Sequence, residues 1–268
     1  MDSILGQEFK HDLLADDELQ TLMKAGVHVG HVKSKTHPAM RPFIFTTRSN
    51  VQIIDVVKTR EYLAKAEAFL QSITARGGLI LWVGTRASAR AAVDEAAGKT
   101  NMPWISSRWV GGLLTNFKVI AKRIADMEDI EKRTASGDLE KYTKQERARI
   151  NDEYQSLLKT YNGLRLLKKM PDAVIVIDTT QDKLAVSEAR RMRIPIVALC
   201  DTNCDPNSIQ YPVPSNDDAR LAVQYMAERF AEAAINGQAE YKRAEVIAKE
   251  REAEVAAAAK EALKEEAK

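Results

Sequence analysis

The sequence predicts an α/β fold: a Rossmann-like (flavodoxin-like) parallel sheet flanked by helices, with a protruding antiparallel coiled-coil hairpin. Two continuous apolar runs, at 173–177 and 195–200, indicate the sheet; each is followed by an aspartate, and a helical pattern at 182–192 separates them. Strands that are apolar on both faces are typical of a parallel sheet covered by helices. Apolar residues at heptad spacing, between the two halves of the sheet, indicate the hairpin.

The first half of the chain alternates between strand and helix patterns. Glycines, histidines, lysines and prolines without periodicity predict a loop before the first strand. A glycine pair predicts the end of the first helix. The expected elements are a loop at 26–42, a strand at 51–55, a helix ending at Gly77 and Gly78, a strand at 79–83, a helix at 88–97 and a short strand at 104–105.

The hairpin is expected at 115–169, as two helices joined by a polar turn around Gly137. Its apolar stripe is narrow, whereas a helix lying flat on a sheet usually needs a broader one. Two ordinary surface helices packed on the sheet are the alternative. The stripe residues are Phe117, Ile120, Ile124, Met127 and Ile130 in the first helix and Ile150, Tyr154, Leu157, Tyr161 and Leu164 in the second.

The last part of the chain divides at Gly237, where a helix that begins beyond Asn216 is expected to end. Residues 238–268 are rich in Ala, Glu, Lys and Arg and have almost nothing to bury, which predicts a solvated helix or a disordered tail. We therefore expect an α/β domain at 1–237, including the hairpin, and a charged C-terminal tail at 238–268.

The composition of the 268-residue chain, 45% hydrophobic and 29% charged, is ordinary for a soluble globular protein. The two cysteines, Cys200 and Cys204, suit a loop in a reducing compartment better than a disulfide framework. The N-terminal segment lacks the pattern of a secretory or transit peptide. No apolar stretch approaches the roughly 20 residues that span a bilayer. We expect a cytoplasmic protein that has no membrane partner.

The basic residues are unevenly distributed. The net charge is only +2, but positions 24–60 carry seven Lys or Arg residues against one acid, a local charge of +6. Four of these cations, interleaved with Phe43 and Phe45, suit RNA binding, because cations neutralise phosphates and aromatic rings stack on unpaired bases. The alternative is a charged loop that is merely solvated. The four are Lys33, Lys35, Arg41 and Arg48.

Phosphate-binding loops of nucleotide enzymes are absent from the sequence, in both the dinucleotide and the P-loop form. The turn at Gly84 and Thr85 lies between a strand and a helix, where backbone amides bind anions. We expect an RNA phosphate there, assisted by Arg86 and Arg90. The alternative is an enzyme acting on a phosphorylated metabolite, with Asp178 or Asp201 as acid or base; we expect no enzymatic activity, because no nucleophile or base accompanies these aspartates.

The segment 108–117 is the most distinctive stretch of the chain, with Arg and Trp before a glycine pair. Thr115 or Asn116 can cap the first hairpin helix. Arg108 is a candidate phosphate contact, and Trp109 either faces RNA or is buried in a tight connection. At the start of the hairpin, Lys118 and Lys122 complete the set of candidate RNA-contacting residues.

Metal ligands are also conceivable, because three histidines lie at 28–37 and a strand end carries further donors. We expect no metal and no other cofactor, since the sequence does not show that these side chains meet. His28 and His31 are instead expected to flank Gly30 in a compact loop, hydrogen-bonded to backbone or RNA. The candidate ligands, should a metal bind, are His28, His31, Asp201 and Asp205.

Several of these motifs, in this order, resemble the family of bacterial ribosomal protein S-two, the second protein of the small ribosomal subunit. The resemblance covers roughly residues 22–230. It is carried by AGVHVGH at 25–31, ARGG at 75–78, VGT at 83–85, RWVGG at 108–112, LTNF at 114–117, PDA at 171–173, DTNCDP at 201–206 and NDDA at 216–219.

The resemblance implies an α/β domain with a coiled-coil hairpin, binding to small-subunit rRNA, and a place in translation beside the ribosomal protein that captures messenger RNA. It also implies other small-subunit proteins as partners; a homo-oligomer is not expected. The chain departs from the family at Val29, usually Phe, and at Ser215, usually Gly. Thr36, His37 and Ala39 stand in a segment that is usually Trp-Asn-Pro-Lys-Met, which puts the stacking and phosphate contacts of that Trp and Lys in doubt here.

Overall fold

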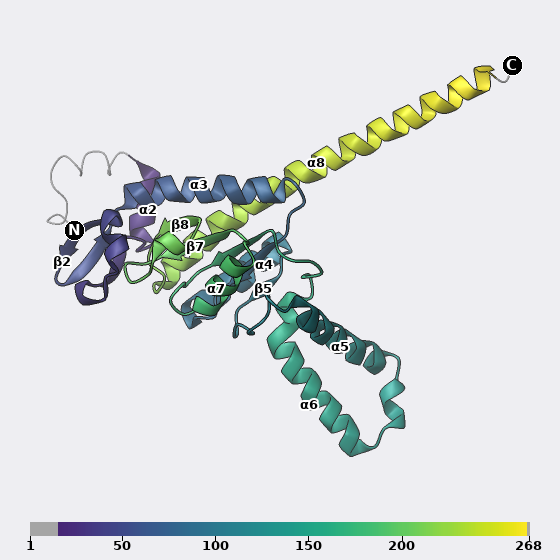
Figure 1. Ribbon diagram of the computed structural model, residues 1–268, viewed down its shortest axis with the longest axis horizontal. Helices are drawn as coiled ribbons and strands as arrows, with labels where there is room; N and C mark the ends of the chain where they lie inside the picture. The colour runs from purple at the N-terminus through teal and green to yellow at the C-terminus, as the bar shows by residue number, and fades with distance from the viewer. Residues whose placement is uncertain (1–15, 267–268) are drawn as a thin grey trace.

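The computed structural model of the protein describes residues 16–266, with side chains described up to residue 247 (Figure 1). The first 15 positions of the expected domain and the last two of the expected tail lie outside the described residues. A main body contains the sheets; a helical hairpin and the end of the long helix α8 project from it in different directions.

Five parallel strands form the main sheet, in the order β5-β4-β6-β7-β8, as the apolar runs predict. Counted along the chain this order is 2-1-3-4-5, so the winding reverses between β4 and β6. In such sheets a crevice forms outside the carboxyl ends of the strands at the reversal. The strands are β4 (Ile80–Val83), β5 (Trp104–Ile105), β6 (Ala173–Val176), β7 (Ile196–Cys200) and β8 (Tyr211–Pro214).

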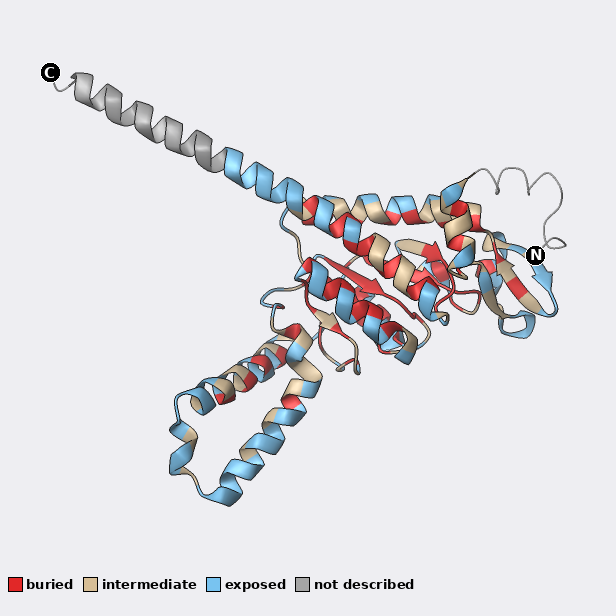
Figure 2. Ribbon diagram, turned by 180° about the vertical axis from the view of Figure 1, so that it is seen from behind, coloured by how far each residue is buried: buried red, intermediate tan, exposed pale blue. Residues whose placement is uncertain are grey.

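Helices cover both faces of this sheet (Figure 2). Successive side chains of a strand point to opposite faces, so Ile80 and Trp82 enter one core while Leu81 and Val83 enter the other. The first core is closed by α2 (Asp17–Lys24), α3 (Val56–Thr74), α4 (Ala87–Thr100) and α8 (Arg220–Glu266), and the second by α7 (Lys183–Arg191) and the connection 109–114.

A second, antiparallel sheet of three strands, in the order β1-β3-β2, corrects two predictions. The segment 26–42 is not only a loop, and the strand expected at 51–55 does not belong to the main sheet. Only alternate residues of β3 are buried, whereas every residue of β4 is buried. This alternation is typical of an antiparallel sheet with one face on a core. The elements are β1 (Val29–Val32), η1 (Lys33–Lys35), η2 (Pro38–Phe43), β2 (Ile44–Arg48) and β3 (Val51–Ile54).

The small sheet is fixed to the carboxyl ends of the main strands. Thr202, just after β7, accepts a hydrogen bond from the His31 amide on its side-chain Oγ1 at 3.0 Å, and its carbonyl accepts from the His37 amide at 2.8 Å. A Cβ atom at Gly30 would lie 2.6 Å from Cγ2 of Thr202. Glycine is therefore required there by the close approach of the two segments.

The hairpin projects from the edge of the body as two helices that diverge toward its tip (Figure 1). Near the body the helices meet through the buried side chains of Met127, Ile130 and Leu157. Toward the tip a cavity of about 340 Å³ separates them. Of the other predicted seam residues, Ile150, Tyr154 and Tyr161 are partly buried and pack against these three buried side chains. The elements are α5 (Phe117–Ala135), η3 (Asp138–Lys141), α6 (Lys144–Tyr161) and η4 (Asn162–Leu164).

Helix α8 continues through Gly237 to Glu266, so the prediction that it ends at Gly237 is wrong. A Cβ atom at Gly237 would lie 2.0 Å from Oγ1 of Thr74 in α3. The glycine thus permits close packing of α8 on α3 instead of ending the helix. Within the described residues no helix is both long and apolar enough to cross a membrane. One further short helix, η5 (Pro206–Ser208), precedes β8.

Candidate nucleic-acid interface

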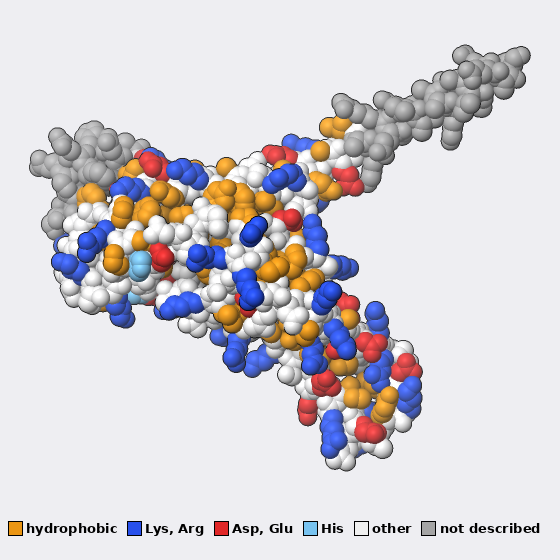
Figure 3. Space-filling view, viewed as in Figure 1, with side chains coloured by type: hydrophobic (Ala, Val, Ile, Leu, Met, Phe, Trp, Pro, Cys, Tyr) orange, Lys and Arg blue, Asp and Glu red, His pale blue; other side chains and the backbone are white. Residues whose placement is uncertain are grey.

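Four of the predicted RNA-contacting cations lie together on the small sheet and its flanking turns, and all four are exposed. Within the described residues the side chains of Lys33, Lys35 and Arg41 make no ion pair. Figure 3 shows Lys and Arg side chains at the end of the molecule that carries β2. Exposed cations are available to neutralise phosphate, so we name Lys33, Lys35, Arg41 and Arg48 the small-sheet surface.

A second group of cations lies at the base of the hairpin, where Arg108, Lys118 and Lys122 are all exposed. None of the three makes an ion pair within the described residues. Trp109 lies differently: its side chain is 7% exposed, and its indole Nε1 donates to Glu188 at 3.0 Å. Trp109 therefore supports the loop from inside, while the three cations form what we name the hairpin-base surface.

Glu188 in α7 organises the segment that follows Trp109. Its two carboxylate oxygens also accept hydrogen bonds from the amides of Gly112, Leu114 and Thr115, over 2.8 to 3.2 Å, and from the Thr115 hydroxyl. Burial acts to raise the pKa of Glu188, but these donors outweigh it and the pKa is lowered. Nothing in a helix pattern at 182–192 distinguishes this glutamate, so sequence reasoning missed it.

Arg86 is placed inside the protein's own charge network, contrary to the prediction of an RNA contact. Its Nη1 lies 2.8 Å from Asp178, 3.3 Å from Asp217 and 2.6 Å from Asp218. These acids lie at the carboxyl ends of β6 and β8 and neutralise the guanidinium. A phosphate at this point would face three carboxylates.

The turn at Gly84 and Thr85 is likewise occupied by protein. The Thr85 amide donates to Asp182 at 3.2 Å, and its hydroxyl donates to the same carboxylate at 2.8 Å. Arg90 is exposed, but its Nε donates to the Thr85 carbonyl at 3.1 Å. Asp182 therefore stands where the sequence predicted a phosphate, and this argues against an RNA phosphate and against a phosphorylated metabolite equally.

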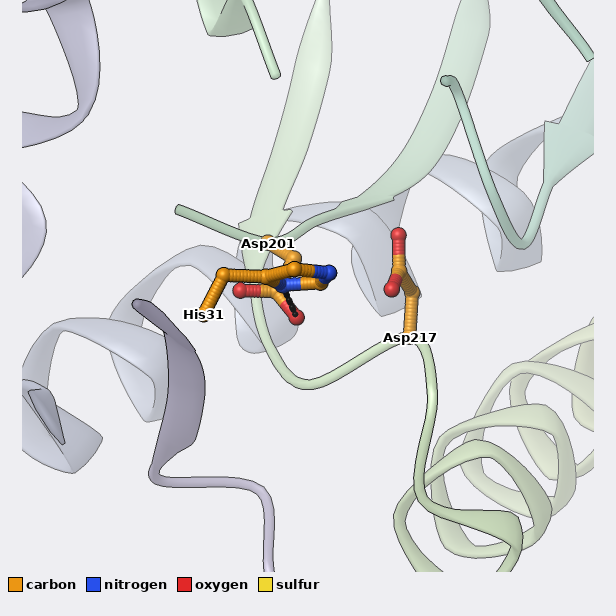
Figure 4. A group of neighbouring side chains, drawn as sticks. All are labelled: His31, Asp201 and Asp217. Atoms are coloured by element: carbon orange, nitrogen blue, oxygen red, sulfur yellow. Dashed lines mark ion pairs between the residues drawn. The ribbon is translucent and has the colours of Figure 1, made fainter. Parts of the chain in front are cut away.

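His31, Asp201 and Asp217 form a cluster beside this network (Figure 4). His31 lies in β1, not in a loop, and its Nδ1 is 2.9 Å from Asp201. One potential ligand atom from each of the three residues lies within 4.8 Å of the others. Of the four candidate metal ligands, the structure brings together His31 and Asp201; His28 and Asp205 are not in this group.

The charges around the cluster favour the binding of a proton by His31 and by Asp217. The hydrogen bond that His31 Nδ1 donates to the Asp201 carboxylate raises the pKa of His31. Burial, and then repulsion from Asp178, Asp201 and Asp218, raises the pKa of Asp217 to about 8. One imidazole and two carboxylates can hold a proton or, in its place, a divalent cation that accepts nitrogen and oxygen ligands. Sequence reasoning missed Asp217, although the Asn-Asp-Asp run after β8 offered a signal.

The comparison with known protein families decides between these readings. A sequence profile described as Ribosomal protein S2 matches residues 22–237. The chain belongs to the ribosomal protein S2 family. Two relatives, each named small ribosomal subunit protein uS2, are similar over 223 residues. The protein of Salinispora tropica is 41% identical, covering 82% of this chain and 75% of its own, and that of Salinispora arenicola is 40% identical, covering 82% and 79%.

Membership of the S2 family confirms the resemblance that the motifs carry. The family is ribosomal and non-enzymatic, which agrees with the occupied turn at Thr85 and removes support for the metabolite-enzyme alternative. The exposed cations of the small-sheet and hairpin-base surfaces are the parts of this S2 protein that suit contact with nucleic acid.

Proposed function

We propose that the protein is a structural constituent of the small ribosomal subunit, which binds rRNA and supports translation without catalysing a reaction. The observation that carries this conclusion is the family match over residues 22–237. The exposed cations of the two surfaces are consistent with it, because phosphate contacts supply most of the non-specific affinity of such proteins.

The rRNA contacts are assigned to the two surfaces defined above. The small-sheet surface binds phosphates at the end of the body, and the hairpin-base surface does so where the hairpin begins. Arg90 contributes its outer guanidinium nitrogens to this binding. Arg86 and Trp109 act from within the protein, because one is neutralised by aspartates and the other is buried.

The finer features of the fold belong to the same proposal. The strand order 2-1-3-4-5 supports a flavodoxin-like sheet, and the contacts of Met127 with α6 support an antiparallel coiled coil near the body. The family match ends at 237, which supports a domain at 1–237 and a separate tail at 238–268, of which residues 238–266 continue the same helix. The hairpin then reaches another part of the subunit.

The proposed partners of the protein follow from its proposed place on the small ribosomal subunit. They are small-subunit rRNA and neighbouring small-subunit proteins, including the one that captures messenger RNA, in the cytoplasm and with no homo-oligomer. The test is sedimentation of the tagged protein from cell lysate at low and high salt. Co-migration with small subunits is expected, whereas a protein that stays at the top of the gradient in both conditions contradicts the proposal.

A further inference from the structure

A pocket of about 280 Å³ opens on the small-sheet surface, between the turns at 33–43 and strands β2 and β3. Two of its residues are the predicted RNA contacts Lys33 and Arg41, and the other four are uncharged. The lining consists of Lys33, Thr36, Arg41, Ile44, Thr47 and Gln52.

The charge of this pocket is purely positive. None of its six lining residues is acidic, and within the described residues neither Lys33 nor Arg41 has an acidic partner. This distinguishes them from Arg86, which three aspartates surround. Two cations that face one opening without a counter-ion favour an anion between them, because each forms a charge-assisted hydrogen bond with it.

The polar groups at the wall of the pocket are only partly satisfied. The Thr36 hydroxyl is buried and has no hydrogen-bond partner. Gln52, whose side chain is 5% exposed, accepts the Thr47 hydroxyl hydrogen on Oε1 at 2.8 Å. A buried hydroxyl without a partner is uncommon in proteins. Thr36 lines the pocket, so an anion bound there is a candidate acceptor for the hydrogen of its hydroxyl.

We propose that this pocket binds a phosphate group, supplied by the backbone of the rRNA. A phosphate has the oxygen acceptors needed for Lys33, Arg41 and the Thr36 hydroxyl at once. No aromatic ring lines the pocket, so it lacks the stacking surface on which proteins hold an unpaired base. Thr36 is also one of the positions at which this chain departs from its family resemblance.

This inference rests on the proposed rRNA-binding function and narrows it to one anchoring contact. The decisive variant is Thr36→Leu, which removes the hydroxyl, places an apolar side chain at the pocket and leaves both cations in place. Its matched control is Ser72→Leu, which makes the same kind of replacement at an exposed position in α3. A second variant, Lys33→Gln with Arg41→Gln, removes the charge without filling the space.

Binding of each full-length variant to small-subunit rRNA is measured over a range of salt concentrations. Loss of one charge-assisted contact weakens binding about tenfold and lowers the magnitude of the log–log salt slope by about 0.7 to 0.9. We expect both changes for Thr36→Leu and neither for Ser72→Leu. We also expect inorganic phosphate to shift the amide resonances of Thr36 and Thr47 in the unsubstituted protein, and rRNA to shift the same resonances.

Three results overturn the inference or its basis in distinguishable ways. If Thr36→Leu binds rRNA like Ser72→Leu while the double charge variant binds weakly, the pocket proposal fails and rRNA binding stands. If inorganic phosphate shifts the Thr36 resonance but rRNA does not, the pocket serves a free anion and the proposal also fails. If the unsubstituted protein does not bind rRNA at all, the proposed function itself fails.

Discussion

Glu188 in α7 accepts a hydrogen bond from the indole Nε1 of Trp109 across 79 positions of sequence, at 3.0 Å. The same carboxylate binds three successive parts of the glycine-containing loop that leads into the hairpin. The start of α5 is therefore tied to the helix on the second face of the main sheet. This contact fixes where the hairpin leaves the body, and with it the hairpin-base surface.

Replacing Glu188 should loosen that connection. In Glu188→Ala the indole and the loop amides lose their acceptor, and leaving buried donors unsatisfied should lower the free energy of unfolding by about 3 kcal/mol. Glu188→Gln keeps one acceptor oxygen and should lose roughly half as much. Urea unfolding followed by circular dichroism measures both effects. An alanine variant as stable as the parent would show that the Glu188 hydrogen bonds do not stabilise the protein.

The hairpin should depend on pH through Glu131. Arg165 donates to both carboxylate oxygens of Glu131, at 2.7 and 2.5 Å, and Tyr154 donates to one of them at 2.7 Å. The hydrogen bonds from Arg165, and then that from Tyr154, lower the pKa of Glu131 from 4.5 to about 2. Since the pKa is lower in the folded state, the stabilisation is complete above 4.5 and is lost as the pH falls toward 2.

The matched comparison is with Glu131→Gln, which cannot ionise. The difference in unfolding free energy between the two proteins should be constant from pH 7 to about 5 and should shrink below that, because protonation removes the charged pairing. Thermal unfolding at several pH values provides the measurement. A difference that already disappears between pH 7 and 5 would mean that the Arg165 pair does not stabilise the fold.

Two helical glycines should respond in opposite directions to alanine. Gly237→Ala places a methyl group against Thr74 and the Gln71 carbonyl, which lie 2.0 and 2.3 Å from the Cβ position. Such overpacking costs about 1 to 3 kcal/mol. Gly98→Ala in α4 meets nothing within 4 Å and should gain about 0.5 to 1 kcal/mol from helix propensity. Equal effects in a denaturation experiment would refute the close packing of α8 on α3.

The main sheet was predictable because its strands are apolar on both faces, as at 173–177. The small sheet was not, because β1, with the sequence Val-Gly-His-Val, has no continuous apolar run and a strand pattern does not specify which sheet a strand joins. The end of the last helix was predicted wrongly at Gly237, because a glycine after an apolar series usually marks a helix end. Here the glycine is explained by the close packing of α8 against Thr74.

The parts of the candidate interface that depend on charges close together in the sequence were predicted. The parts that depend on ion pairs between residues far apart in the sequence were missed. The run of cations around Lys33 and Arg41 is visible in the sequence and is exposed in the structure. Two of the acids that neutralise Arg86, Asp178 and Asp217, lie 92 and 131 positions away, and Asp201 lies far along the chain from His31. No spacing rule connects such residues, so only the fold reveals which cations are free.

The most direct test of rRNA binding is the triple variant Lys33→Ala, Lys35→Ala and Arg41→Ala, compared with Lys99→Ala, Lys242→Ala and Arg243→Ala. Both remove three positive charges, but only the first set lies on the small-sheet surface. The first variant should incorporate poorly into small subunits and lower the magnitude of the salt slope by about 2 to 3, whereas the second should behave like the parent. Equal incorporation and equal slopes for the two variants would contradict the account.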